Sequence, residues 1–200
     1  MKNTLFALLL LSFTVSDNIH AAADENTASQ SIPEVELAPP GGDFTLHSAT
    51  GPVALKEFRG KAVFLYFGYT NCPDVCPTSL SYLTQALNEL SEQELKRVNG
   101  IFISVDPQRE TMQGLQEYAE YFHPNLIGVT GTAEEVAEAA KKYGAKYYEV
   151  ALEGSAFGYS INHSVSTYLI APDGTLRFIF PHGTPPMVLL KAVQYVLEGN

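Results

Sequence analysis

The stretch GKAVFLYFGYTNCPDVCPTSL, residues 60–80, joins a continuous apolar run to both cysteines of the chain. The run at residues 61–67 is rich in aromatic and β-branched side chains, which favours a strand that is buried on both faces. Cys72 and Cys76 follow it four residues apart, and each precedes a proline. Leucines then recur at near-helical spacing over residues 78–98, and Gly100 closes the pattern. We therefore expect a strand, a loop that carries the thiols, and a helix.

Strand-like and helix-like patterns alternate through the rest of the chain. The sequence predicts an early hairpin around Gly51-Pro52 and a late hairpin whose strands flank the Ala171-Pro172-Asp173-Gly174 turn. The other expected elements are strands at residues 100–105, 126–130 and 146–150, and helices at residues 111–122, 133–143 and 187–197. This order predicts an α/β fold in which helices flank a mostly parallel central sheet with an antiparallel edge and an N-terminal β-hairpin extension.

Residues 1–23 have the composition of a secretory signal peptide. A basic residue precedes an apolar segment, and Ala21-Ala22-Ala23 forms an A-x-A cleavage site. We expect a product that is exported to the periplasm and soluble; the alternative is an uncleaved N-terminus that anchors the chain to the inner membrane. Residues 24–40 are polar, contain two adjacent prolines and predict a flexible leader, which leaves residues 41–200 as one domain.

The chain is acidic, with 12 Lys and Arg residues against 22 Asp and Glu residues and a net charge of −10. Nucleic-acid binding needs clustered Lys and Arg to contact phosphates, and the sequence has no such cluster. Apart from the signal peptide, no stretch is long and apolar enough to span a bilayer. We therefore expect no nucleic-acid partner and no stable membrane span after signal cleavage.

The place of the cysteines in this order favours reactive thiols. The loop between the carboxyl end of a buried strand and the next helix is where α/β folds bind ligands. Backbone N–H groups and the helix dipole lower the pKa of a thiol at such a position. We expect Cys76 to cap the helix and Pro77 to lie in its first turn.

The cysteine pair has three possible roles: a structural disulfide, a redox couple or a metal site. A bridge between Cys72 and Cys76 would close so short a loop that it would contribute only about 2 kcal/mol to stability. Two thiolates are soft ligands that suit Cu(I) or Zn(II), but a metal site needs at least one more ligand. The spacing alone does not separate the redox role from the metal-binding role.

Five histidines are the candidates for a third ligand. His163 is the first choice because it precedes a late strand that should lie beside the first strand of the sheet. His182 is the second, in a loop after the last strand. His20 leaves with the signal peptide, His47 lies in the early hairpin, and His123 stands at a helix end where it can act as a C-terminal cation.

Four motifs give the chain a resemblance to a known family. The strings GKAVFLYFGYTNCPDVCPTSL, ISVDPQRET, EYFHPNLIGVTGT and NHSVSTYLIAPDG are similar, in content and order, to the Sco/SenC family of exported copper proteins. The resemblance implies a thioredoxin-like fold and a metallochaperone rather than an enzyme. It also implies one copper ion per chain, as Cu(I) or Cu(II), bound by Cys72, Cys76 and His163. The implied role is to supply or prepare the dinuclear copper A centre of cytochrome c oxidase.

The resemblance also implies partners and an alternative function. The partners are the copper A subunit of the oxidase or another exported copper protein, and a periplasmic copper chaperone or thiol reductase. The alternative is a thiol–disulfide oxidoreductase, in which Cys72 and Cys76 keep the copper-site cysteines of the target reduced. Thioredoxins, however, carry C-x2-C and a proline before the late strand, and neither occurs here. Peroxide reduction supported by Arg109 is a further, weaker alternative.

Two positions depart from the usual pattern of the family. Asn162 stands where Asp commonly precedes the histidine, and an acid there could orient the ligand ring. DPQRET replaces the more usual DPERDT; within it, Asp106 and Thr111 most simply form an Asp-Pro turn and a helix cap. Asp74, a hard oxygen donor between the cysteines, is expected to be solvated rather than bound to a metal.

Overall fold

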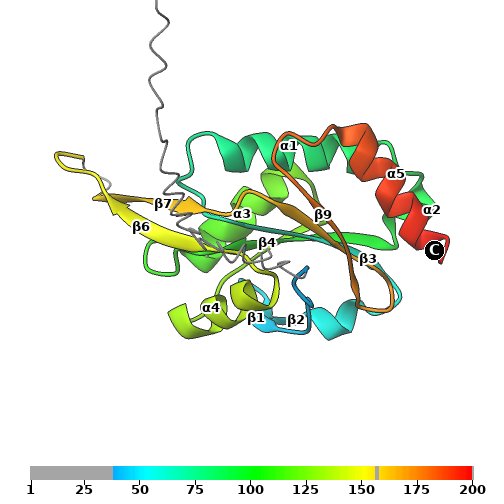
Figure 1. Ribbon diagram of the computed structural model, residues 1–200, viewed down its shortest axis with the longest axis horizontal. Coiled ribbons are helices and arrows are strands. Elements are labelled where there is room, and N and C mark those ends of the chain that lie inside the picture. Colours follow the sequence, from blue (N-terminus) through cyan, green and yellow to red (C-terminus); the bar gives the residue numbers. More distant parts are fainter. Residues whose placement is uncertain (1–37, 156–157, 200) are drawn as a thin grey trace, which may run out of the picture. The chain divides into compact units, whose positions relative to one another are not determined.

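A five-stranded mixed sheet runs through the centre of the domain (Figure 1). In this computed structural model, which describes residues 38–155 and 158–199, the strand order is β5-β4-β3-β8-β9. Three strands are parallel: β3 (Ala62–Gly68), β4 (Val98–Ser104) and β5 (Leu126–Val129). β8 (Thr167–Ile170) runs antiparallel to both β3 and β9 (Leu176–Phe180). The predicted mostly parallel sheet with an antiparallel edge is confirmed, and the predicted signal peptide lies outside the described residues.

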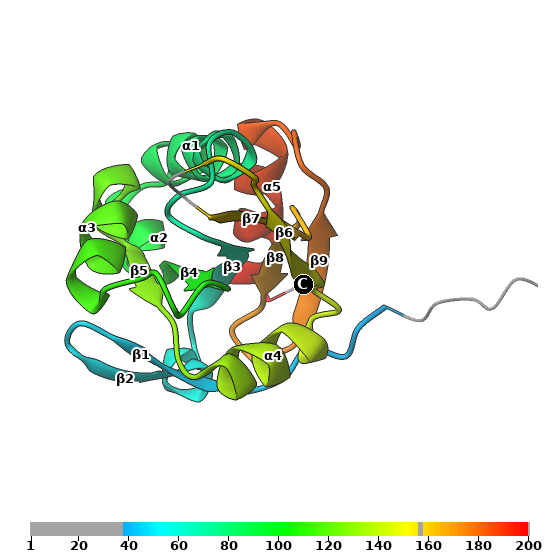
Figure 2. The same ribbon diagram turned by 90° about the vertical axis from the view of Figure 1, so that its left-hand side faces the viewer.

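Helices cover both faces of this sheet, as Figure 2 shows. One face carries α1 (Val75–Asn88), α3 (Met112–Phe122) and α5 (Pro186–Leu197). The other carries α4 (Ala133–Lys142) and the hairpin of β1 (Thr45–Ser48) and β2 (Gly51–Ala54), which the short helix η1 (Leu55–Phe58) follows. Right-handed crossovers from β3 to β4 and from β4 to β5 advance in one direction, so α1 and α3 share a face.

The leucine pattern after the cysteines was interpreted as too long a helix. α1 ends at Asn88, and a separate turn of helix, α2 (Glu92–Leu95), follows it. Ser91 begins α2 with a capping box in which its hydroxyl and Glu94 satisfy each other's backbone N–H groups. The next strand begins at Val98, so Gly100 lies inside β4; a Cβ atom there would come 2.5 Å from Leu126. Gly100 therefore allows close strand packing and does not end a helix.

A second hairpin, separate from the central sheet, carries one of the candidate ligands. β6 (Tyr147–Ala151) pairs antiparallel with β7 (Tyr159–His163), and this two-stranded ribbon extends past the sheet (Figure 1). The strand predicted at residues 146–150 is confirmed, but its partner β7 was not predicted. None of the helices in the described part of the chain is long and apolar enough to cross a membrane.

Candidate metal centre

The two cysteines lie where β3 gives way to α1. Cys72 is in the connecting loop and is 8% exposed, and Cys76 is fully buried as the second residue of the helix. The residue at the helix N-cap is Asp74, so the prediction that Cys76 caps α1 was wrong by two positions. Pro77 lies in the first turn, as predicted, because its missing N–H costs no hydrogen bond there. Asp74 is exposed, which agrees with the expectation that it is solvated.

Gly68, the last residue of β3, makes room for the buried sulfur. A Cβ atom at this position would lie 2.7 Å from the Sγ atom of Cys76 and 2.9 Å from the ring of Phe102. Any larger side chain would therefore displace the cysteine or the aromatic ring beside it. We did not single out Gly68 from the sequence, although a glycine at the end of a buried strand next to a ligand loop often marks a close approach.

His163 reaches the cysteines from the end of β7. Its Nε2 atom lies 3.3 Å from the Sγ atom of Cys76 and 4.0 Å from that of Cys72, and the three ligand atoms all lie within 4.8 Å of one another. A trigonal metal bound at about 2.3 Å from sulfur and 2.0 Å from nitrogen would place a sulfur and the nitrogen about 3.7 Å apart. The residues present therefore fit one metal ion with little rearrangement.

The imidazole of His163 is oriented by its surroundings. Nδ1 lies 2.9 Å from the backbone oxygen of Ser164, and only an N–H group can bond to a carbonyl oxygen. In the neutral imidazole this contact places the proton on Nδ1 and leaves Nε2 with a lone pair directed at the sulfurs. The rings of Tyr66 and Tyr69 meet the imidazole edge-on, with centroids 6.2 and 5.8 Å away. The position and the tautomer of the histidine are therefore set by the fold.

The other histidines do not join this group. His182 is exposed, and its Nδ1 atom is hydrogen-bonded to the hydroxyl of Ser79 at 3.0 Å. His47 is exposed on β1. His123 is buried at the end of α3, where its Nδ1 atom accepts the backbone N–H of Asn125. Burial lowers the pKa of His123, so its predicted role as a C-terminal cation was wrong; His20 lies outside the described residues.

The two thiols differ strongly in acidity. A hydrogen bond from the thiol of Cys76 is the largest of several contacts that lower the pKa of Cys72 to about 4, against the opposing effect of burial. Burial in turn raises the pKa of Cys76 well above its usual range, and the neighbouring Cys72 raises it further. Both cysteines are free in the structure. At neutral pH the metal-free pair therefore consists of a Cys72 thiolate and a Cys76 thiol.

The turn at residues 106–111 contacts β7, the strand that carries His163. Its predicted roles are confirmed, since Asp106 accepts two backbone N–H groups in a turn and Thr111 caps α3 through its hydroxyl. In addition, the buried carboxylate of Asp106 accepts hydrogen bonds from Arg109 and from the phenol of Tyr159, at the start of β7. The sequence contained a signal for this, because the carboxyl ends of the parallel strands β3 and β4 meet at one edge.

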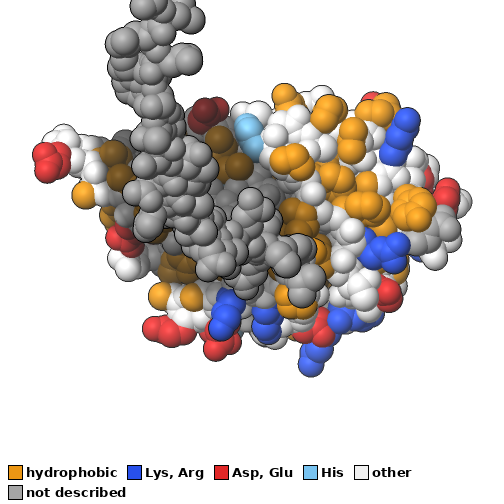
Figure 3. All heavy atoms as spheres, in the orientation of Figure 1, with side chains coloured by type: hydrophobic (Ala, Val, Ile, Leu, Met, Phe, Trp, Pro, Cys, Tyr) orange, Lys and Arg blue, Asp and Glu red, His pale blue; other side chains and the backbone are white. Residues whose placement is uncertain are grey.

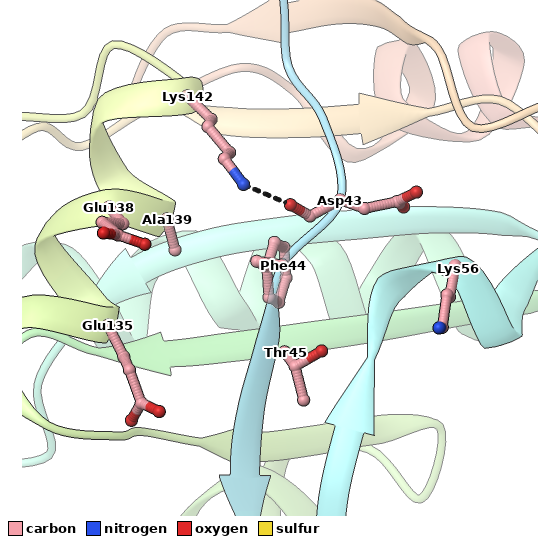
Figure 4. Close-up of a pocket in the computed structure, with 8 residues that line it drawn as sticks. All are labelled: Asp43, Phe44, Thr45, Lys56, Glu135, Glu138, Ala139 and Lys142. Carbon is pink, nitrogen blue, oxygen red and sulfur yellow. Dashed lines mark hydrogen bonds between the residues drawn. The ribbon is translucent and has the colours of Figure 1, made fainter.

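A mostly apolar groove of about 210 Å³ opens beside Cys72. Its lining includes both neighbours of the cysteine in the chain and the exposed Leu152. A larger hollow of about 320 Å³, shown in Figure 4, lies between α4 and β1. It is lined by charged side chains such as Lys56 and Glu138 and contains none of the three candidate ligands. Of these two hollows, the groove beside Cys72 is the one placed for chemistry at the thiols.

Exposed apolar side chains gather elsewhere on the surface. Figure 3 shows them over α5 and β9, and they include Ile179, Met187, Val188 and Tyr195. This apolar patch contains none of the cysteine or histidine ligands.

Known proteins resemble the chain over most of its length. The SCO1/SenC family model matches residues 34–198. The mitochondrial SCO2 homolog of Bos taurus is 42% identical over 135 residues, which make up 66% of this chain and 50% of that protein. An SCO2-like protein of Rickettsia felis is 34% identical over 162 residues, 80% of this chain and 76% of that protein. The chain thus spans about half the length of the bovine relative.

Solved structures of copper-bound relatives share the fold. Arabidopsis thaliana ScoI with copper bound superposes with a TM-score of 0.73 at 36% identity, covering 80% of this chain and 99% of that one. Bradyrhizobium japonicum ScoI with copper bound gives a TM-score of 0.70 at 34% identity, covering 78% and 99%. These neighbours confirm the predicted thioredoxin-like fold. The chain therefore belongs to the SCO1/SenC family.

Proposed function

We propose that the chain is an exported copper metallochaperone that binds one copper ion through Cys72, Cys76 and His163. Its task is to supply or prepare the dinuclear copper A site of cytochrome c oxidase. The observation that carries the proposal is the convergence of two sulfurs and one imidazole nitrogen within 4.8 Å of one another. The copper-bound structures of two relatives support copper as the cargo.

The donor set suits copper in either oxidation state. Two thiolates and a neutral imidazole are the soft and borderline donors that Cu(I) prefers. Their combined charge leaves a Cu(I) site with one negative charge and a Cu(II) site neutral, so neither state is strongly disfavoured. Cys72 enters the site already deprotonated, whereas Cys76 must release its proton before its sulfur can bind. Loading is therefore coupled to the release of one proton from this pair.

The same arrangement permits release. Three ligands leave room for a thiolate of the receiving protein to approach the cargo and replace the donors one at a time. Cys72 is the sulfur nearer the surface, and the apolar groove beside it gives an incoming segment a place to pack. A closed four-ligand site would hinder such an exchange.

The proposed partners follow from this chemistry. The receiving protein is the copper A subunit of the oxidase or another exported copper protein, and a periplasmic copper chaperone or thiol reductase loads or reduces the pair. The predicted signal peptide supports a periplasmic location, while several relatives are named as mitochondrial proteins. The excess of acidic side chains supports the absence of a nucleic-acid partner.

A thiol–disulfide oxidoreductase is the second candidate, favoured by the acidic thiol of Cys72. In that reaction the Cys72 thiolate attacks a disulfide of the target and displaces one target thiolate. Cys76 then loses its proton, attacks the sulfur of Cys72 in the mixed disulfide and releases the second target thiolate. The target gains two electrons, and the Cys72–Cys76 pair becomes a disulfide that a thiol reductase must reduce.

An anaerobic Cu(I) competition titration of the reduced protein tests the copper proposal. Cys72→Ala, Cys76→Ala and His163→Ala should each weaken a single tight site. His182→Ala is the matched control, because this exposed histidine is bonded to Ser79 outside the ligand group. Weak binding that does not change with His163→Ala would overturn the three-ligand site. Reduction of a disulfide-bonded target by His163→Ala at the wild-type rate would then favour the oxidoreductase.

A further inference from the structure

The carboxylate of Glu110 accepts three hydrogen bonds, two from the loop before Cys72 and one from the end of β4. Its Oε1 atom accepts the backbone N–H of Thr70 at 2.9 Å and the hydroxyl of Ser104 at 2.8 Å. Its Oε2 atom accepts the hydroxyl of Thr70 at 2.9 Å. Both donors of Thr70, from backbone and side chain, therefore end on one carboxylate. Hydrogen bonds to a charged acceptor are stronger than those between neutral groups.

These contacts join the loop to the rigid end of the sheet. Thr70 stands two residues before Cys72, in the connection between β3 and α1. Ser104 is the last residue of β4 and is fully buried, and its backbone oxygen accepts the hydroxyl of Thr130 next to β5. The carboxylate of Glu110 thus links the loop before Cys72 to a point held by two parallel strands.

The loop before Cys72 is held by contacts of several kinds. The backbone N–H of Cys72 donates to the oxygen of Tyr69 at 3.2 Å, which forms a tight turn. Pro73, the next residue, has no N–H to donate. The position of Cys72 relative to His163 therefore depends on the groups that contact this turn. Arg109 lies over the ring of Tyr69, and Glu110 is the charged group that hydrogen-bonds to both the backbone and the side chain of Thr70.

From these contacts we infer that Glu110 is a positioning residue, which holds the Cys72 sulfur within bonding reach of a metal shared with Cys76 and His163. Glu110 acts through Thr70, and the hydrogen bonds of its carboxylate go to Thr70 and Ser104 rather than to a sulfur. The inference deepens the proposed function and rests on it for the identity of the metal. The contacts of Glu110 do not include a metal ligand, so the restraint on the loop can be measured without copper.

The first measurement is hydrogen exchange of the peptide that spans Thr70 and Cys76 in the reduced, metal-free protein. Glu110→Ala should speed exchange in this peptide by about tenfold or more, because the Thr70 N–H loses its acceptor. Glu110→Gln retains a carbonyl oxygen for that N–H and should restore most of the protection. Glu117→Ala is the control. Glu117 lies exposed on α3, and its carboxylate accepts a hydrogen bond from the side chain of Gln113, away from the cysteine loop. Unchanged exchange in Glu110→Ala would overturn the inference.

The second measurement is a double-mutant cycle in Cu(I) affinity. Glu110→Ala should weaken binding by about tenfold, the lower end of the effect of residues that orient metal ligands. If Glu110 acts through Cys72, the substitution Glu110→Ala should cause no further loss of Cu(I) affinity in a Cys72→Ala background. An equal loss in both backgrounds would show a general structural role and overturn the inference. Should Glu110→Ala fail to fold, Thr70→Val, which removes the hydroxyl donor and keeps the backbone N–H, takes its place in the double-mutant cycle.

The two proposals can fail separately. If the wild-type protein does not bind Cu(I) at one tight site, the proposed function fails, and the exchange measurement still decides whether Glu110 restrains the loop. If the wild type binds Cu(I) tightly and Glu110→Ala binds equally well, the proposed function stands and the inference about Glu110 is wrong.

Discussion

His163 holds its Nε2 atom 3.3 Å from the sulfur of Cys76, although 87 residues separate them in the chain. The antiparallel pairing of β8 with β3 brings the end of β7 next to the cysteine loop. The pairing of distant strands thus brings the ligand atoms together, so the cost of ordering them is met when the chain folds. Each part of this arrangement can be tested by changing one residue.

Gly68→Ala should displace the sulfur of Cys76. The added Cβ atom would start 2.7 Å from Sγ, closer than two such atoms approach in folded proteins, so Cu(I) affinity should fall by at least about tenfold. Competition titration and thermal unfolding should be measured together. Gly128→Ala is the control, because its Cβ would meet the backbone oxygen of Leu115 and reduce stability away from the ligands. If both variants bind Cu(I) like the wild type, the close approach at Gly68 has no bearing on the site.

Iodoacetamide should modify Cys72 and largely spare Cys76 in the reduced, metal-free protein. The pKa of Cys72 is lowered to about 4, so its thiolate persists from pH 8 down to about pH 5 and is lost only as the pH approaches 4. Cys76 stays protonated across this range, because burial raises its pKa. Mass spectrometry of the labelled peptides at pH 6 should show Cys72 as the main product. Labelling of Cys72 that falls about tenfold per pH unit below pH 8, as in the unfolded chain, would contradict the lowered pKa.

Asn162→Asp, which restores the residue common in the family, should change Cu(I) affinity by no more than about twofold. The Nδ2 group of Asn162 donates to the phenol of Tyr148 at 2.9 Å, whereas the ring of His163 is oriented by the oxygen of Ser164. Surface substitutions of this kind usually shift free energies by less than about 0.5 kcal/mol. The titration should include Asn162→Ala as a second variant. A large gain in affinity with Asp alone would show that the acid orients the histidine after all.

Folding stability should fall as the pH drops below about 6.5, in part through His123. Burial lowers the pKa of this histidine in the folded state, so the unfolded chain takes up the proton first. The contribution is fully present above the unfolded pKa and is lost as the pH falls toward the folded pKa. One proton limits the slope to about 1.4 kcal/mol per pH unit.

His123→Asn should remove this contribution, because asparagine has no titrating group. The side-chain oxygen of Asn can still accept the backbone N–H of Asn125, as the histidine does now, so the fold should be kept. Urea unfolding of the wild type and the variant between pH 7.5 and 5 measures the difference. His47→Asn, at an exposed position on β1, is the control and should keep the wild-type slope. Equal slopes for the wild type and His123→Asn would mean that the buried histidine takes up its proton without cost.

The fold was largely predictable because local patterns and long-range packing agree. The apolar run at residues 61–67 became the fully buried central strand β3, which starts and ends one residue later than the run. Thr111 caps α3, and the turn at residues 171–174 joins β8 to β9, both as expected. The errors lie where local signals compete. Ser91 begins a new helix within the leucine pattern, and Gly100 serves strand packing rather than a helix end. The cap of α1 fell on Asp74 because the helix begins before Cys76.

The sequence by itself determined which chemistry is available: two soft thiols four residues apart, at the carboxyl end of a buried strand, and a small set of histidines. The sequence already favoured His163 among these histidines, but only the tertiary structure decided how close it comes to the sulfurs, how its ring is oriented, and which thiol holds the proton. It also revealed the contacts of Gly68 and Glu110 with the site. Composition and spacing carry information about residues that are close in the chain. Ligand distances and pKa values depend instead on burial, and on side chains that come together only when distant strands pair.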